Sequence, residues 1–95
     1  MNTIWKFPLL GLGYQKIEMP VGASILCVQE QNNTPQIWAR CDPDCTLKEY
    51  RHFRIYATGE HFKDSKGYIG TFQVNLGAFV FHLFEDTFED TLEVE

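Results

Sequence analysis

The sequence contains no hydrophobic run close to the ~20 residues that a membrane-spanning helix needs, which excludes an ordinary transmembrane helix. Its first residues, Met1 to Lys6, also lack the positively charged block and the apolar block of a secretory signal peptide. We therefore expect a soluble intracellular protein that makes no contact with a membrane.

Cysteine is scarce. The three cysteines, Cys27, Cys41 and Cys45, are an odd number that does not suit a secreted fold held by disulfides. In a reducing cytosol we expect free thiols, with Cys27 in the core. Cys41 and Cys45 are spaced like one half of a metal-binding knuckle, but a structural zinc site needs four ligands and a second pair at matching spacing is missing. We predict no metal site and no cofactor.

Basic residues are also few. Eight Lys and Arg oppose 13 Asp and Glu, which gives a net charge of −5 and a pI of about 5.1, far below that of a typical nucleic-acid binder. The one basic patch, residues 48–54, has aromatic residues interleaved, as platforms for single-stranded nucleic acid do. Because the chain is acidic overall, we do not expect direct nucleic-acid binding. Internal pairing of this patch with the acidic C-terminus is the alternative.

The sequence shows no catalytic signature. His82 lies between Phe81 and Leu83, and the sequence identifies neither an orienting partner nor a nucleophile for it. The turns that contain Gly59 and Gly67 lack the spacing and the following helix of a phosphate loop. We therefore predict that the protein is not an enzyme.

Alternating apolar and polar residues dominate the first 84 positions, and turn residues recur about every 8–12 residues. This pattern predicts an all-β fold, or a β-rich α+β fold: a small antiparallel barrel or sandwich of six to seven short strands. Residues 24–31 are apolar on both faces, which favours a central strand. Phe53, Ile55 and Ala57 share one face of their strand. The expected strands cover residues 4–9, 14–19, 24–31, 36–41, 51–57, 68–74 and 78–84.

The charge is distributed unevenly along the chain. Six of the 13 acids lie in residues 85–95, which contain no Lys or Arg, whereas the preceding 84 residues sum to +1. We expect a single β-rich domain over residues 1–84 and an acidic C-terminal segment over residues 85–95. Phe84, Phe88 and Leu92 are spaced as on one face of a helix, so a helix or a partly ordered segment is favoured there.

The acidic segment predicts a partner-binding site. A plain solubility tail, the simplest alternative, has no use for large apolar residues, whereas a binding segment uses them as anchors while its acids meet Lys or Arg on the partner. Acids along an ordered element can also imitate DNA phosphates. The predicted contact residues are Glu85, Asp86, Phe88, Glu89, Asp90, Leu92 and Glu93.

Six sequence blocks occur in the following order along the chain: Ile4-Trp5-Lys6-Phe7-Pro8-Leu9, Ile17-Glu18-Met19-Pro20-Val21-Gly22-Ala23, Ile37-Trp38-Ala39, Phe53-Arg54-Ile55-Tyr56-Ala57-Thr58-Gly59, Tyr68-Ile69-Gly70-Thr71-Phe72-Gln73 and Phe79-Val80-Phe81-His82-Leu83-Phe84-Glu85. In this order they resemble a small family of phage and prophage proteins of unknown function. The resemblance covers roughly residues 4–85 and implies a bacteriophage origin and an action inside a bacterium. It implies no activity, no cofactor and no catalytic residue.

The leading prediction is a non-enzymatic phage protein that binds a host protein with a basic surface in the bacterial cytoplasm. It would inhibit that protein by occlusion or acidic mimicry, as an anti-defence or anti-CRISPR-like inhibitor, with Trp5 or Trp38 contributing if exposed.

Two other functions remain as alternatives. One is a binder that sequesters a nucleotide signal, and the other is a minor virion or assembly protein. A homodimer through an edge strand also stays open. The residues predicted for the ligand-binding alternative are Arg51, His52, Arg54, Thr58 and His61.

Overall fold

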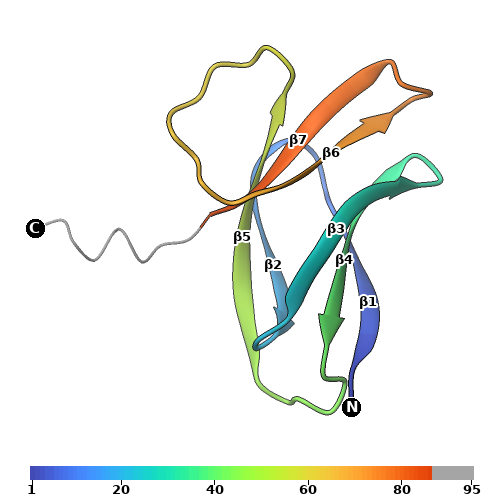
Figure 1. The fold of residues 1–95 in the computed structure, drawn as a ribbon, viewed down its shortest axis with the longest axis vertical. Helices are drawn as coiled ribbons and strands as arrows, with labels where there is room; N and C mark the ends of the chain where they lie inside the picture. Colours follow the sequence, from blue (N-terminus) through green and yellow to red (C-terminus); the bar gives the residue numbers. More distant parts are fainter. Residues whose placement is uncertain (87–95) are drawn as a thin grey trace, which may run out of the picture.

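The computed structural model describes residues 1–86 and confirms the predicted all-β fold (Figure 1). Seven antiparallel strands form two sheets, and the described residues contain no helix. The strands are β1 (Thr3–Pro8), β2 (Gly13–Pro20), β3 (Ser24–Gln31), β4 (Thr34–Cys41), β5 (Lys48–Ala57), β6 (Tyr68–Val74) and β7 (Phe79–Asp86).

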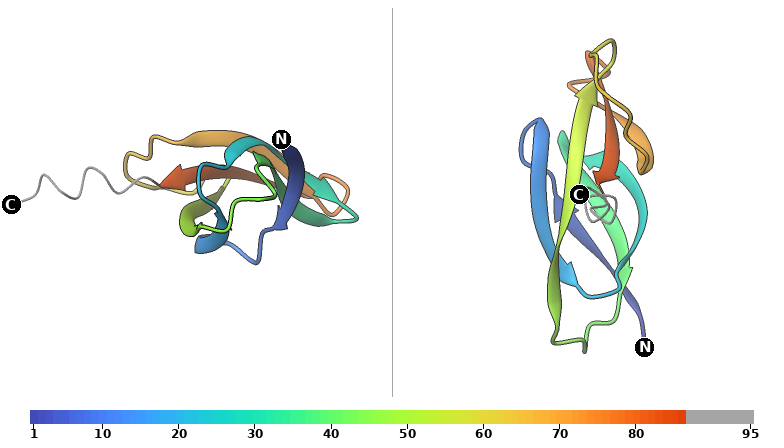
Figure 2. Two further views of the ribbon diagram at one scale, coloured as in Figure 1. Left: turned by 90° about the horizontal axis from the view of Figure 1, so that it is seen from below. Right: turned by 90° about the vertical axis from the view of Figure 1, so that its left-hand side faces the viewer.

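The two sheets form the two layers of a sandwich (Figure 2). The three-stranded sheet has the order β1-β4-β3, and the four-stranded sheet has the order β2-β5-β7-β6. The chain changes sheet between β1 and β2, between β2 and β3, and between β4 and β5. Both sheets therefore form only after segments distant in sequence have come together.

The two hairpins depend on residues that accept a positive φ. Asn32 and Asn33 have φ values of 52° and 67° and form the two-residue turn between β3 and β4, where asparagine is favoured. At the turn between β6 and β7, Asn75 and Leu76 also have positive φ. The Asn75 amide donates to Oδ1 of Asn33 over 2.6 Å, so the tips of the two hairpins are joined.

The core consists of the alternate residues that each sheet directs toward the other. On β5 the predicted inward face is confirmed for Phe53 and Ile55, which are almost fully buried. Ile37 and Ala39 of β4 occupy the same core from the opposite sheet. The remaining buried core residues are Leu9, Met19, Ala23, Val28, Cys41, Phe72 and Leu83.

The predicted central position of β3 was wrong, because β3 lies at the edge of the three-stranded sheet. Its apolar residues on both faces have another cause. A β-bulge between Ile25 and Cys27 interrupts the alternation, and β3 packs beside β6 of the other sheet. Val28 is buried there against Gly70, whereas Cys27 is only half-buried. The buried cysteine is Cys41.

The last strand is longer than the sequence suggests. β7 continues to Asp86, so Glu85 and Asp86 pair with β5 as members of the sheet. The sequence prediction had placed both of them in the acidic segment. The predicted helical spacing through Phe88 and Leu92 lies outside the described residues.

We predict that Gly67→Ala strongly destabilises the protein. The Glu85 amide donates to the Gly67 carbonyl over 2.8 Å, and a Cβ at position 67 would overlap the Glu85 carbonyl oxygen. Urea unfolding should show a loss of about 3 kcal/mol in the free energy of unfolding. Ser65→Ala in the same loop is the control, with a change within about 0.5 kcal/mol. Equal effects of the two variants would contradict this contact.

Candidate interaction face

The two acids that end β7 each meet an arginine of β5. Because side chains alternate along a strand, Glu85 and Asp86 point to opposite faces of the four-stranded sheet. Glu85 contacts Arg51 on the inner side, and Asp86 contacts Arg54 on the outer side. The internal pairing between the basic patch and the acidic C-terminus is thus observed for these two acids.

Arg51 is the more enclosed of the two arginines. Its Nε and Nη2 donate to the two carboxylate oxygens of Glu85, with 3.1 Å for Nη2, and its Nη1 donates to the Ala23 carbonyl over 2.7 Å. The side chains of Arg51 and Glu85 are only 18% and 21% exposed. The hydrogen bond to Glu85 raises the pKa of Arg51, against the opposing effect of burial.

The raised pKa of Arg51 has no consequence at ordinary pH. An interaction that raises the pKa of an arginine stabilises the folded state at every pH below the ordinary arginine pKa. That stabilisation is lost only as the pH rises through the raised pKa of the folded state. Both values lie in the strongly alkaline range, so Arg51 remains charged wherever the protein can be handled.

Arg54 belongs to a strip of aromatic and basic residues on the outer face of β2 and β5. Its Nε donates to Asp86 over 2.7 Å, and this hydrogen bond raises its pKa. Its guanidinium also lies 5.2 Å from the centre of the Tyr14 ring, and the Tyr14 hydroxyl is 2.8 Å from Nδ1 of His52. We call Tyr14, Lys16, Tyr50, His52 and Arg54 the aromatic–basic strip.

The other end of the strip is open to solvent. Lys16 Nζ lies 4.5 Å from the centre of the Tyr50 ring, close enough for a cation–π contact. Tyr50 is 54% exposed, and Lys16 is exposed as well. Register explains this arrangement, because β2 pairs with β5 so that Lys16 stands opposite His52 and Tyr50 stands opposite Glu18, two residues further along the same face.

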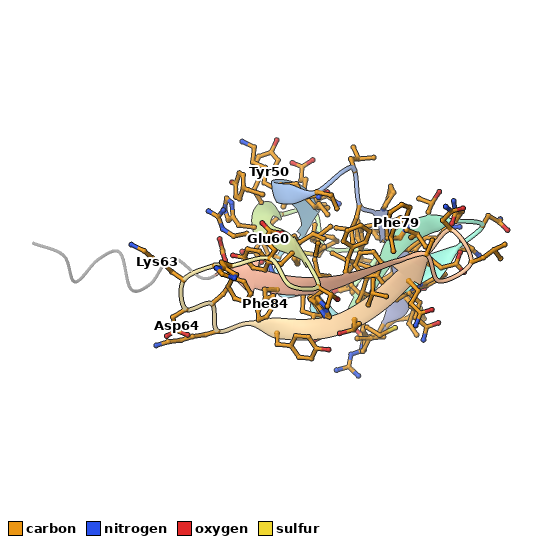
Figure 3. The ribbon with its side chains drawn as sticks, turned by 90° about the horizontal axis from the view of Figure 1, so that it is seen from above. Tyr50, Glu60, Lys63, Asp64, Phe79 and Phe84 are labelled. Atoms are coloured by element: carbon orange, nitrogen blue, oxygen red, sulfur yellow. The ribbon has the colours of Figure 1, made fainter. Side chains whose placement is uncertain are left out.

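A second group of rings continues this outer face over β5, β7 and β6. Phe62, from the loop of residues 58–67, stacks on Tyr56 of β5 with a centroid distance of 3.9 Å. Phe84 of β7 contacts both rings, and Tyr68 of β6 contacts Phe84 at 5.4 Å. We call Tyr56, Phe62, Tyr68 and Phe84 the aromatic cluster. Figure 3 shows Phe84 and Tyr50 toward one end of the molecule and Phe79 toward the other.

Beside the cluster, His82 is held at both ring nitrogens. Nδ1 lies 2.9 Å from Oγ1 of Thr71, and Nε2 lies 2.7 Å from Oγ1 of Thr58. The Tyr68 hydroxyl extends this chain by a 2.6 Å hydrogen bond to Thr71. His82 of β7 therefore links Thr71 of β6 to Thr58, the residue that follows β5. Both of its ring nitrogens have a hydrogen-bond partner.

The structure separates the residues predicted for ligand binding. Arg51 lies on the inner side of the sheet, whereas His52 and Arg54 lie on the outer side. Thr58 contacts His82 at the far end of β5, and His61 is exposed in the loop. These five residues do not converge on one pocket.

Only two of the residues predicted for partner binding, Glu85 and Asp86, lie within the described part of the chain. Glu85 and Asp86 are engaged with arginines, and the side chain of Asp86 is only 16% exposed. The other predicted contact residues, Phe88, Glu89, Asp90, Leu92 and Glu93, lie outside the described residues. Within residues 1–86, no group of three or more His, Cys, Asp or Glu could hold a metal ion.

Sequence analysis missed Tyr14, Lys16, Phe62 and Tyr68 as members of a shared surface. The alternation in residues 14–19 does place Tyr14 and Lys16 on one face of a strand. This alternation does not indicate which strand pairs with residues 14–19. The position of Phe62 depends on how the loop folds back over Tyr56, which no local pattern indicates.

Fold and surface together define a two-sheet antiparallel β domain with an aromatic and basic outer face. The chain belongs to the family described as a domain of unknown function, DUF7352, whose model matches residues 1–93. No curated protein and no solved structure matches the chain. In the part of the chain that the structure describes, no helix is long and apolar enough to cross a membrane.

We predict that Arg51→Gln costs about 2–3 kcal/mol of unfolding free energy, because it leaves the enclosed Glu85 carboxylate without its cation. Arg40→Gln is the matched control, because Arg40 is an exposed arginine of β4, and it should change the free energy of unfolding by at most about 0.5 kcal/mol. Urea unfolding of both variants measures the difference. Similar losses for the two would contradict the structural role assigned to Arg51.

Proposed function

We propose that this protein is a non-enzymatic, phage-encoded binding protein that inhibits a bacterial host protein by occlusion. The observation that carries the proposal is the outer face of the four-stranded sheet, where the aromatic–basic strip and the aromatic cluster lie side by side. Tyr14, Tyr50, Phe62 and Tyr68 on this face are between 46% and 58% exposed.

Such a face has the composition of a protein-binding surface. Tyrosine, phenylalanine and arginine are enriched where proteins bind one another, because they combine a large apolar contact with a polar group. Here the rings are held in place before binding by Arg54, by the hydrogen bond between Tyr14 and His52, and by the stacking of Phe62 on Tyr56. Little side-chain freedom is then lost on association, which favours affinity.

The charge distribution supports a partner that contacts both parts of the chain. Residues 1–86 hold nine acids and eight bases and are nearly neutral, while Glu89, Asp90, Glu93 and Glu95 follow with no base among them. Asp86 lies on the outer face, beside Arg54. A partner that covers the exposed rings could therefore also present Lys or Arg to the acids that follow Asp86 in the sequence.

The nucleotide-binding alternative receives less support from the contacts. The donors of Arg51 are directed to Glu85 and Ala23, and Nε of Arg54 is directed to Asp86. A nucleotide phosphate would have to displace a carboxylate to reach Arg51, and at Arg54 it would meet a guanidinium group whose charge is already balanced by Asp86. The proposed phage origin, the cytoplasmic site of action and the anti-defence role rest on the family resemblance of the sequence blocks.

The test is a pull-down from bacterial lysate, with mass-spectrometric identification of the captured protein and calorimetry on the purified pair. We expect Lys16→Ala combined with Tyr50→Ala to weaken binding about tenfold or more. Amide substitutions at Glu89, Asp90, Glu93 and Glu95 should weaken it as well. This set leaves Glu85 and Asp86 unchanged, so the sheet stays intact.

Ile4→Ala is the matched control, because Ile4 is 58% exposed on the other sheet. It should bind like wild type. A partner that the face variant and the amide variant bind as tightly as wild type would overturn the proposed surface. A melting temperature raised by a nucleotide, with no protein captured, would favour the ligand-binding function instead.

A further inference from the structure

One end of the sandwich opens into a small apolar pocket. Its volume is about 200 Å³, and its walls come from both sheets and from the loop between β1 and β2. The floor belongs to the core, since Leu9, Ile55 and Phe72 are almost fully buried. The lining consists of Leu9, Gly11, Leu12, Asn33, Pro35, Ile55, Phe72, Val74 and Phe81, with no charged residue among them.

Exposed apolar side chains lie at this pocket. Leu12, which lines it, is 60% exposed. Phe79 is 53% exposed and stacks on Phe81 of the lining with a centroid distance of 6.3 Å. Figure 3 shows Phe79 at the end of β7 away from Phe84, so this surface is separate from the aromatic cluster.

Size and polarity restrict what the pocket can hold. An apolar cavity of roughly 150 Å³ stays dry and accepts a benzene ring, so one ring or one branched aliphatic group fits here. Pockets for cofactors and drug-sized ligands are larger, about 300–1,000 Å³. A charged group would lose its hydration without gaining a partner in the lining.

We propose that the pocket receives one apolar side chain, aromatic or branched aliphatic, from a partner protein. The exposed side chains at the pocket make a protein the source, because Leu12 and Phe79 would remain in water around a free small molecule but are covered when a polypeptide docks. A central anchor in a pocket with apolar contacts around it is the usual arrangement of a protein-binding hot spot. The inference adds a second contact surface to the proposed function and rests on that function for its partner.

The pocket can be tested without the partner. We would titrate N-acetyl-L-phenylalanine amide and N-acetyl-L-leucine amide into the ¹⁵N-labelled full chain and follow the amide signals, with N-acetyl-L-alanine amide as the control ligand. The expected result is saturable binding in the millimolar range by the first two compounds only. The shifted signals should belong to Leu9, Gly11, Leu12, Ile55, Phe72, Val74 and Phe81.

Two variants give the matched comparison. Leu12→Asp places a charge in the mouth and should weaken binding about tenfold or more, whereas Leu47→Asp, at a position of similar exposure outside the lining, should leave it unchanged. Val74→Phe fills the pocket and should abolish binding while the other amide signals keep their positions. Equal affinities for Leu12→Asp and Leu47→Asp would overturn the proposal.

Two further outcomes would also overturn it: no saturable shift with either compound, or shifts at the aromatic–basic strip instead. Binding of isobutylbenzene without binding of the two amino-acid amides would assign the pocket to a free hydrophobic molecule. The result does not depend on the sheet face, so failure here and failure of the proposed function remain distinguishable.

Discussion

The guanidinium group of Arg51 connects three segments that the chain order keeps apart. It extends from β5 to the end of β7 through Glu85, and to the turn between β2 and β3 through the Ala23 carbonyl. The strand that follows this turn belongs to the other sheet, so one side chain ties the two layers together. The Glu85 amide donates to Gly67 at the same place, and the loop of residues 58–67 returns to the sheet there.

Because side chains alternate along a strand, the two acids at the end of β7 contact arginines on opposite faces of the sheet. Glu85 is directed inward, where it completes the junction of the sheets, and Asp86 is directed outward, where it holds Arg54 against Tyr14. Both arginines of the basic patch are thereby neutralised. The outer face then presents aromatic rings with Lys16 as an exposed cation, which is a surface suited to a protein more than to a phosphate.

Local patterns were sufficient to predict most of the strands but not their neighbours. Phe53 and Ile55 alternate in sequence and are buried in the structure, and a turn lies between the strands expected at 24–31 and 36–41, although it takes only Asn32 and Asn33 because β4 begins at Thr34. The position of β3 was misjudged, because its second apolar face packs against β6 from a different sheet. Glu85 and Asp86 could not be separated from the acids that follow them, since their partners Arg51 and Arg54 lie more than 30 residues away.

The same limit applies to the surface. Tyr14, Phe62 and Tyr68 come from three distant segments. The register of β2 with β5 and of β6 with β7 places the two tyrosines on one face, and the fold of the loop places Phe62 on Tyr56. Sequence analysis directed attention to the charged C-terminus, where the composition is most unusual. The contacts within residues 1–86 instead favour the outer face of the four-stranded sheet as the candidate site.

The central claim is that Arg51 is locked between the two sheets, and hydrogen exchange of arginine side chains tests it most directly. The Nε–H signals of Arg51, Arg54 and Arg40 can be followed separately by NMR. The account predicts exchange at Arg51 on the order of 100-fold slower than at Arg40, an exposed residue, with Arg54 in between. Equal exchange at Arg51 and Arg40 would show that the junction is open to water, and would contradict the account.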